Sequence, residues 1–331
     1  MTQKQHPVGS GFTAASTADD GVAGIDLSGR NVIVTGGHIG LGLETTRALS
    51  NAGASVTVAV RNPDRAAPAL EGIERVETSQ LDLLDPTSID AFAARYRDSG
   101  RPLHVLVNNA GIMGGPLVRD ARGYEAQFAT NHLGHFQLTL GLLPALRAAA
   151  GARVVELSSA GHRLSDIRWD DPHFNDDYDG MLAYGQAKTA NILFAVELDR
   201  RWAGDGIRGY SLHPGQIVGT GLAPWLGDEE LRSMGLIDDS GQPIIDPERD
   251  MKTPQQGAST SVFAATSPLL ADIGGVYLKD NDIATLSASA MPVGDRFGSS
   301  PVDTSGGVTP YAVDPESAQR LWELSEQLLK A

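Results

Sequence analysis

The chain has 331 residues, of which 41% are hydrophobic and 20% charged, the composition of an ordinary globular protein. Its formal net charge of −15 opposes binding to nucleic acid or to an anionic membrane surface, and no apolar run reaches the ~18 residues of a membrane-spanning helix. The chain has no cysteine, which excludes disulfides, thiolate metal sites and a cysteine nucleophile. Because its first residues also lack the apolar stretch of a secretory signal, we expect a cytoplasmic protein.

Strand-like segments alternate with helical segments along the chain. Residues 1–28 are rich in small and polar residues and predict a flexible arm that packs onto the body late, around Phe12 and Ile25. The predicted strands are residues 31–35, 54–60, 76–81, 104–107, 153–157, 207–212 and 275–278. The predicted helices are residues 43–52, one that opens at Pro63, and residues 85–97, 124–148, 183–202, 229–234, 254–265 and 315–329, with loop at 284–312. This alternation predicts an α/β fold in a single domain over residues 29–283: a doubly wound, Rossmann-type parallel sheet of about seven strands with helices on both faces.

The first strand leads directly into a glycine-rich turn. The β-branched run Asn31–Thr35 is followed by Thr35-Gly36-x3-Gly40-x-Gly42 and then by a helix with apolar faces. Glycines let the backbone turn tightly and approach a phosphate, and the unpaired N–H groups of a helix N-terminus face that phosphate. The stretch therefore predicts a site for a dinucleotide cofactor.

A second chemical signature lies on the predicted helix 183–202. Tyr184 and Lys188 are four residues apart, which places them side by side on one helix face. A neighbouring ammonium lowers the pKa of a phenol, so the pair can donate a proton to a carbonyl oxygen or accept one from an alcohol. Ser159, just after the fifth strand, can supply a hydroxyl to the same oxygen.

Together these features resemble the single-domain branch of the short-chain dehydrogenase/reductase family. The matching residues are Thr35-Gly36-x3-Gly40-x-Gly42, Asn108-Asn109-Ala110-Gly111, Asn131, Ser159, Tyr184-x3-Lys188 and His213-Pro214-Gly215, in family order over about residues 27–280. Asn131-His132-Leu133-Gly134-His135-Phe136 and Lys188-Thr189-Ala190-Asn191 are similar to the retinol-dehydrogenase and WW-domain-oxidoreductase group. The chain departs from the family pattern after Pro214-Gly215, where Gly219 or Thr220 could face the carboxamide of the cofactor.

The resemblance implies a role for each matching residue. Tyr184 is the proton donor or acceptor, Lys188 lowers its pKa and holds the nicotinamide ribose, Ser159 holds the substrate oxygen, and Asn131 supports a water relay through a helix kink. The residues implied in cofactor binding are Thr35, Gly36, His38, Ile39, Gly40, Leu41, Arg61, Asn62, Asp82, Leu83, Asn109, Ala110, Gly111, Tyr184, Lys188, Pro214, Gly215 and Ile217. The segment 219–253 is implied to form a substrate lid, with Trp225 and His162 as candidate substrate contacts.

The choice of cofactor depends on the end of the second strand. Users of NAD place an acidic residue there for the ribose 2′-hydroxyl, whereas this chain has Val60 and then Arg61. Because an arginine can pair with a 2′-phosphate, we favour NADP(H) over NAD(H), although His38 and Ile39 stand where many NADP users carry a second basic residue. The alternative for Arg61 is a solvated charge at a strand end.

Two further patterns have simpler interpretations than a metal site. His132 and His135 are three residues apart on a helix, but no carboxylate pattern accompanies them, so we expect packing and no metal. Residues 166–179 contain six aspartates, which could meet a cationic substrate or calcium but more simply form a solvated flap.

The sequence thus predicts an oxidoreductase that transfers a hydride between NADP(H) and a small-molecule ketone or aldehyde, or its alcohol. Two alternatives stay open: a C=C reductase or lyase on the same scaffold, and a dinucleotide-binding protein without turnover. The family often pairs the two long helices, here 124–148 and 183–202, across a subunit interface, so we also expect a homo-oligomer, either a dimer or a tetramer.

Overall fold

The structure, a computed structural model, describes residues 4–287 and 306–330. Its centre is an eight-stranded sheet in the order β3-β2-β1-β4-β5-β6-β7-β8. The strands are β1 (Asn31–Thr35), β2 (Ser55–Val60), β3 (Val76–Gln80), β4 (Val105–Asn108), β5 (Ala152–Leu157), β6 (Ile207–His213), β7 (Val276–Lys279) and β8 (Asp282–Ile283). All neighbouring strands are parallel except β7 and β8. The predicted doubly wound sheet is confirmed, and the short antiparallel β8 extends it by one strand beyond the seven expected.

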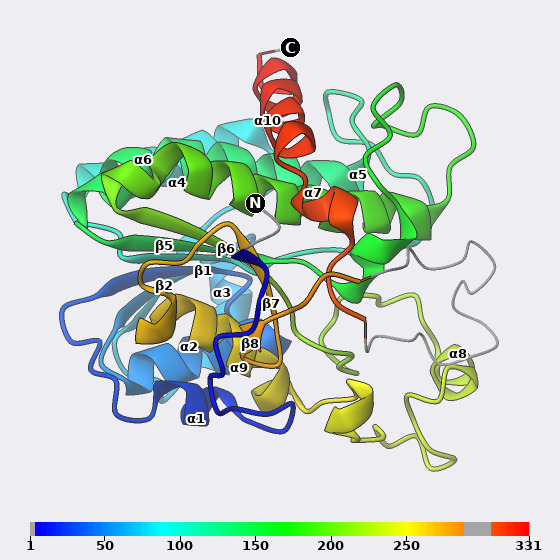
Figure 1. The fold of residues 1–331 in the computed structure, drawn as a ribbon, viewed down its shortest axis with the longest axis horizontal. Helices are drawn as coiled ribbons and strands as arrows, with labels where there is room; N and C mark the ends of the chain where they lie inside the picture. Colours follow the sequence, from blue (N-terminus) through cyan, green and yellow to red (C-terminus); the bar gives the residue numbers. More distant parts are fainter. Residues whose placement is uncertain (1–3, 288–305, 331) are drawn as a thin grey trace.

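Helices cover both faces of the sheet (Figure 1). One face carries α1 (Ala18–Val22), α2 (Gly40–Asn51), α3 (Pro63–Ala66) and α9 (Pro254–Thr266). The other carries α4 (Pro86–Asp98), α6 (Gly134–Ala148), α7 (Gly180–Trp202) and α10 (Pro315–Leu328). Two further short α-helices in the described part of the chain are α5 (Ala126–Phe128) and α8 (Asp228–Ser233). Within the described part of the chain, no helix combines the length and the apolar character needed to cross a bilayer.

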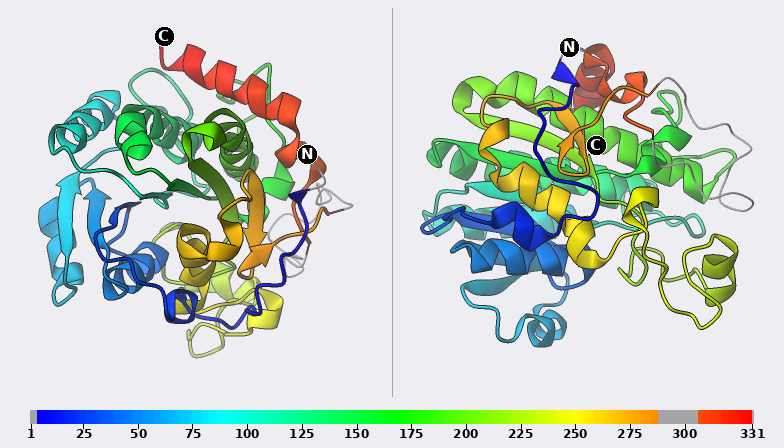
Figure 2. Two further views of the ribbon diagram at one scale, coloured as in Figure 1. Left: turned by 60° about the vertical axis from the view of Figure 1, so that its left-hand side comes forward. Right: turned by 60° about the horizontal axis from the view of Figure 1, so that its bottom comes forward.

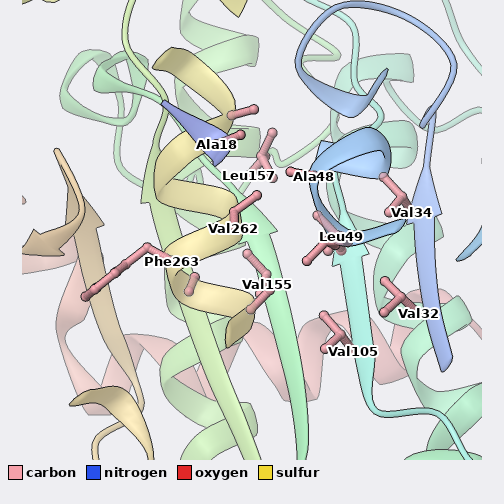
Figure 3. Packing of buried hydrophobic residues seen from close by; sticks show 14 of the residues in the cluster. Ala18, Val32, Val34, Ala48, Leu49, Val105, Val155, Leu157, Val262 and Phe263 are labelled. Carbon is pink, nitrogen blue, oxygen red and sulfur yellow. The ribbon is translucent and has the colours of Figure 1, made fainter. Parts of the chain in front are cut away.

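The strands are apolar on both faces because both faces are covered. Successive side chains of a strand point to opposite sides, so Val32 and Val34 of β1 pack with Leu49 of α2, whereas Ile33 faces α4 and α6. Figure 3 shows the α2 side of this core, where Val262 of α9 joins the same cluster. The continuous β-branched runs of the sequence are therefore buried central strands.

The amino-terminal segment lies against the body of the protein (Figure 2), with Phe12 and Ile25 packed on the core. The Gln5 side-chain amide donates hydrogen bonds to the carbonyls of Tyr277 and Ala284, each at 2.6 Å. The ring of Phe12 packs edge-on against Phe263 of α9, with 5.9 Å between ring centroids. These contacts tie the segment to α9 and to the β7 edge of the sheet.

The carboxy-terminal helix α10 covers α7. Trp322 of α10 packs edge-on against Phe136 of α6 and Trp202 of α7, with centroid distances of 4.9 and 5.3 Å. Every residue from 183 to 199 is buried, so over this length α7 has no exposed face. α10 of the same chain thus covers α7, a contact that the expected pairing of the two long helices across a subunit interface did not include. The homo-oligomer stays a prediction.

Candidate active site

A cleft of about 810 Å³ opens where the parallel strands end. The loops after the first six strands of the chain contribute to its walls, and the segment after β6 continues around its mouth. The cleft therefore lies at the carboxyl edge of the sheet, where doubly wound folds bind ligands. Of the residues predicted to bind cofactor or substrate or to catalyse, all line this cleft except Thr35, Gly40, Asn62, Asn131, His162 and Trp225.

The glycine loop forms a cradle at the N-terminus of α2. Gly36 and Gly40 have φ values of +66° and +53°, a backbone conformation that side chains disfavour. A Cβ on Gly42 would lie 2.4 Å from the carbonyl oxygen of Gly36, so only glycine allows the helix to approach the loop this closely. The N-cap residue Ile39 offers no side-chain hydrogen bond, which leaves the first N–H groups of α2 for a ligand. These features fit a diphosphate.

Thr35 does not line the cleft, but its hydrogen bonds hold the loop after β4 against the end of β1. Its Oγ accepts the backbone N–H groups of Asn109 and Ala110 at 2.9 and 3.0 Å, and Asn109 Nδ2 donates to the Thr35 carbonyl at 2.8 Å. Nε2 of His135 lies 2.9 Å from Thr35 Oγ, and Nδ1 lies 3.0 Å from the carbonyl oxygen of Asn131. Because a carbonyl only accepts, we assign the proton of His135 to Nδ1, so that Nε2 accepts the Thr35 hydroxyl.

Arg61 and His38 lie together at the β2 end of the cleft. Arg61 is exposed and follows β2 directly. Burial, and then the charge of Arg61, lower the pKa of His38. Asn62 faces elsewhere, because its Oδ1 accepts the N–H of Arg65 at 3.1 Å and caps α3. The Asn62 side chain thus has a structural task that the resemblance did not indicate.

Three of the four predicted catalytic residues, Ser159, Tyr184 and Lys188, line another wall of the cleft. Asp179 caps α7 by accepting the N–H groups of Met181 and Leu182, each at 2.9 Å, and Tyr184 and Lys188 follow one turn apart on this helix. Ser159 Oγ accepts the N–H of Gly161 at 3.0 Å and is also hydrogen-bonded to Tyr184. A Cβ at Gly161 would lie 2.8 Å from the ring of Tyr184, so glycine at this position leaves room for the tyrosine.

Burial has a strong effect on the pKa of both Tyr184 and Lys188. Burial raises the pKa of Tyr184 to about 12, and the hydrogen bond from Ser159 opposes this only in part. The ammonium of Lys188 lies 5.6 Å from the centroid of the tyrosine ring and donates to the carbonyl of Leu157 at 2.8 Å. Burial lowers the pKa of Lys188 itself to about 8. Burial is therefore the largest influence on the pKa of Tyr184 in this structure, and the lowering of that pKa by Lys188 stays a prediction.

Asn131 lies in a π-helical turn, Ala129–Leu133, that connects α5 to α6. Its Oδ1 accepts the N–H of Ile112, and its Nδ2 donates to the carbonyl of Ile112, both at 2.9 Å. The side chain thus fixes the loop after β4 and does not line the cleft.

Neither candidate substrate contact lines the cleft. His162 is 1% exposed; its Nδ1 lies 2.6 Å from the carbonyl oxygen of Ser159 and its Nε2 accepts the N–H of Thr309 at 3.2 Å. Trp225 is 48% exposed, and its Nε1 donates to the carbonyl of Met113 at 2.7 Å. We correct both assignments: His162 joins the Ser159 turn to the carboxy-terminal segment, and Trp225 fastens the lid segment to the loop after β4.

The lid segment contributes an apolar wall. Leu222, Leu226, Leu231, Met234 and Leu236 line the cleft from this segment. Met113 and Leu164 face them from the loops after β4 and β5, and sequence reasoning did not identify these two residues. Gly219 and Thr220 both line the cleft as well, so the choice between them stays open.

The two polar patterns that the sequence analysis weighed as metal sites have hydrogen-bond partners within the protein. His132 is buried, and its Nε2 lies 2.7 Å from Ser325 Oγ of α10. In the acidic loop, Asp171 accepts the N–H groups of Asn175 and Asp176 at 2.9 and 3.3 Å. Among the residues that the structure describes, no group of three or more histidine and carboxylate side chains is arranged to hold a metal ion.

Comparisons with known proteins identify the family of the chain. The family model described as short chain dehydrogenase matches residues 30–230. A probable oxidoreductase of Streptomyces lividans is 45% identical, over 93% of this chain and 100% of its own. Retinol dehydrogenase 12 of Mus musculus is 34% identical, over 92% of this chain and 88% of its own. The WW domain-containing oxidoreductase of Danio rerio is 36% identical, over 93% of this chain and 70% of its own.

A solved structure of an uncharacterized protein from Mycobacterium paratuberculosis has a TM-score of 0.69 and 32% sequence identity, and the match covers 96% of this chain and 98% of that one. The group resemblance suggested by the sequence is thus confirmed by relatives that carry those names. The matching family model and the extent of these relatives show that the chain belongs to the short-chain dehydrogenase/reductase family and is an NAD(P)-dependent oxidoreductase.

Proposed function

We propose that the protein is an NADP(H)-dependent oxidoreductase that interconverts a ketone or aldehyde and its alcohol. The observation that carries the proposal is that Tyr184, Ser159 and Lys188 line the same cleft as the glycine cradle of α2. A carbonyl held between these two walls would have a proton donor on one side and a cofactor on the other.

In the reducing direction the carbonyl oxygen gains negative charge and needs a proton. Tyr184 keeps its proton at neutral pH because burial raises its pKa to about 12, so it serves as the donor. Ser159, hydrogen-bonded to Tyr184, orients the same substrate oxygen. The nicotinamide, when bound, supplies or accepts the hydride. In the oxidising direction Tyr184 must first release its own proton to solvent, and its phenolate oxygen then accepts the proton of the alcohol.

The residues that line the cleft divide between the parts of the cofactor. The first turn of α2 and Gly36 would hold the diphosphate, and Arg61, assisted by His38, the 2′-phosphate. Asn109, Ala110 and Gly111 would line the adenosine side with Asp82 and Leu83, and Lys188 would hold the nicotinamide ribose. Pro214, Gly215 and Ile217 would contact the nicotinamide. The apolar wall of the lid segment, residues 219–253, supports an apolar carbonyl compound as substrate.

Thermal unfolding with NADPH, with NADH or with neither tests the cofactor preference. A ligand at one hundred times its Kd stabilises the folded state by about 2.7 kcal/mol. We expect the larger shift with NADPH, and we expect R61Q to abolish the difference between the two cofactors, whereas R65Q on α3 retains it. A larger shift with NADH would refute the role of Arg61, and no shift with either would refute the dinucleotide site.

The proton transfer is tested by Y184F, which keeps the ring and removes the hydroxyl. General acid catalysis contributes about 10²- to 10⁴-fold, so we expect a loss of that size in kcat with little change in the Kd for NADPH. The matched control is Y178F, because Tyr178 accepts a hydrogen bond from Gln127 at 3.2 Å outside the cleft. Carbonyl reduction at a near-normal rate by Y184F would overturn the mechanism.

A further inference from the structure

The loop 214–217, which we propose contacts the nicotinamide, is held from behind by a short strap, residues 250–252. The N–H of Gln216 donates to the carbonyl of Asp250 at 2.7 Å, and the N–H of Lys252 donates to the carbonyl of Gln216 at 3.0 Å. At Gly215, where φ is +100°, a Cβ would lie 2.9 Å from the carbonyl oxygen of Asp250 and 2.9 Å from Cδ of Lys252. The strap therefore lies directly against the loop, on the side away from the cleft.

Two ion pairs join the strap to the end of β7. Lys252 Nζ pairs with Asp280, and Lys279 Nζ lies 2.8 Å from Oδ2 of Asp250. The side chain of Lys252 is 1% exposed, whereas that of Asp280 is 31% exposed. Because a buried ammonium needs a counter-charge close by, the Lys252 side chain fixes the strap against the end of β7.

The turn that carries Asp280 is itself fixed. Asp280 and Asn281 have φ values of +52° and +62° and connect β7 to β8. Two residues of α9 hold this turn: Thr260 Oγ1 accepts the N–H of Asn281 at 3.2 Å, and the Ser259 hydroxyl donates to Asn281 Oδ1 at 2.8 Å. Asp280 is therefore a firmly placed partner for Lys252, and its position does not depend on the cleft.

The same cluster reaches the turn that carries Ser159. His213, the last residue of β6, accepts the N–H of Ala160 at Nδ1 over 3.1 Å, and its Nε2 lies 3.9 Å from Oδ2 of Asp250. Burial lowers the pKa of His213 well below its usual range, so the ring is neutral and carries its proton on Nε2, toward Asp250. The strap thus lies beside groups that fix both the loop 214–217 and the serine turn.

We propose that Lys252 is a positioning residue that holds the loop 214–217 at the nicotinamide, so that the ring faces the substrate beside Tyr184. The inference rests on the proposed function, in which this loop contacts the nicotinamide. Without the Lys252 ammonium, Asp280 would be solvated and the strap would lose its tie to β7. The nicotinamide half of the cofactor would then bind more weakly, whereas the adenosine half, held by the glycine cradle and Arg61, would bind as before.

K252M tests this with two ligands, NADPH and 2′-phospho-ADP-ribose, which lacks the nicotinamide. Methionine keeps an unbranched side chain and removes the ammonium. We expect calorimetry to show a Kd for NADPH raised about tenfold and a Kd for 2′-phospho-ADP-ribose within about twofold of wild type. The matched control is K4M, because Lys4 pairs with Asp199 at 3.7 Å outside the cleft and should leave both Kd values unchanged. An unchanged affinity of K252M for NADPH would overturn the proposal, as would an equal loss for both ligands, which would indicate a general distortion.

D280N breaks the same pair from its other side. Asparagine tolerates the positive φ of this turn, so the backbone can stay as it is. We expect D280N to weaken NADPH binding as K252M does, and the double variant to be no weaker than the single variants, because one interaction is lost in all three. Losses that add in the double variant would overturn the proposal. If K252M does not fold, D280N with the same two ligands decides.

Amide hydrogen exchange tests the tie between strap and loop without any cofactor. We expect peptides that contain Gln216 or Lys252 to exchange about tenfold faster in K252M, and peptides of β1 and α2 to exchange as in wild type. Unchanged exchange at the loop would overturn the proposal. If wild type bound neither ligand, the proposed dinucleotide-dependent function would fail, while hydrogen exchange would still decide whether Lys252 holds the loop.

Discussion

The glycine cradle can be tested by adding one methyl group at Gly42. An alanine Cβ there would lie 2.4 Å from the carbonyl oxygen of Gly36 and 2.6 Å from Nδ2 of Asn109, whereas ordinary contacts begin at 3.4 Å. The loop or α2 must therefore move by about 1 Å, which in a close-packed interior costs about 1–3 kcal/mol of stability. The movement also displaces the backbone N–H groups proposed to meet the diphosphate.

Loss of one hydrogen bond to a charged group costs about 1.5–3 kcal/mol, so we expect G42A to weaken NADPH binding roughly 10- to 150-fold. NADPH fluorescence titration measures the Kd, and thermal unfolding without ligand separates lost affinity from lost stability. The matched control is G204A, since a Cβ at Gly204 has no neighbour within 4 Å and lies outside the cleft. Binding by G42A within about twofold of wild type would refute the close approach of α2 to the loop as the basis of the site.

Three other predictions concern stability and the lid. W322A should lower the free energy of unfolding, measured by urea titration, by about 3–5 kcal/mol, because Trp322 is 3% exposed between α6 and α7. An unfolding midpoint equal to that of wild type would contradict this. Burial lowers the pKa of His132, His135 and His162 from 6.5 to about 3, 4 and 4. Below about pH 6.5 these histidines therefore become protonated in the unfolded chain but stay neutral in the folded chain. Stability should be complete above about pH 6.5 and fall on acidification by about 1.4 kcal/mol per pH unit for each histidine, and a flat profile of unfolding free energy down to about pH 5 would exclude this. W225A removes the hydrogen bond to Met113 and should raise the KM for a carbonyl substrate about fivefold without changing the Kd for NADPH; equal changes in both would point to a general distortion.

The sequence was sufficient to predict those parts of the site whose residues are close together in the chain, within one turn or one helix. The turn after β1 follows from the spacing of Gly36, Gly40 and Gly42, and the adjacency of Tyr184 and Lys188 follows from one turn of a helix. The directions of His162 and Trp225 depended on partners far away in sequence, Thr309 and Met113, which no spacing reveals. A carboxylate inside a strand, such as Glu156, looks like a solvent-facing position until the helices on that face are known. Part of the predicted loop 284–312, residues 288–305, lies outside the described residues.

The cover that α10 provides over α7 has a consequence for synthesis. All eight strands and the residues of the cleft precede Pro315 in the chain, so a nascent chain can complete the sheet and the cofactor cradle before α10 leaves the ribosome. Until then the aromatic residues that pack against Trp322 lack that partner and expose part of their surface. They are Phe136, Phe194 and Trp202. A chain that stops short of α10 therefore exposes this aromatic surface of α6 and α7 to other molecules, and the docking of α10 is the step that covers it.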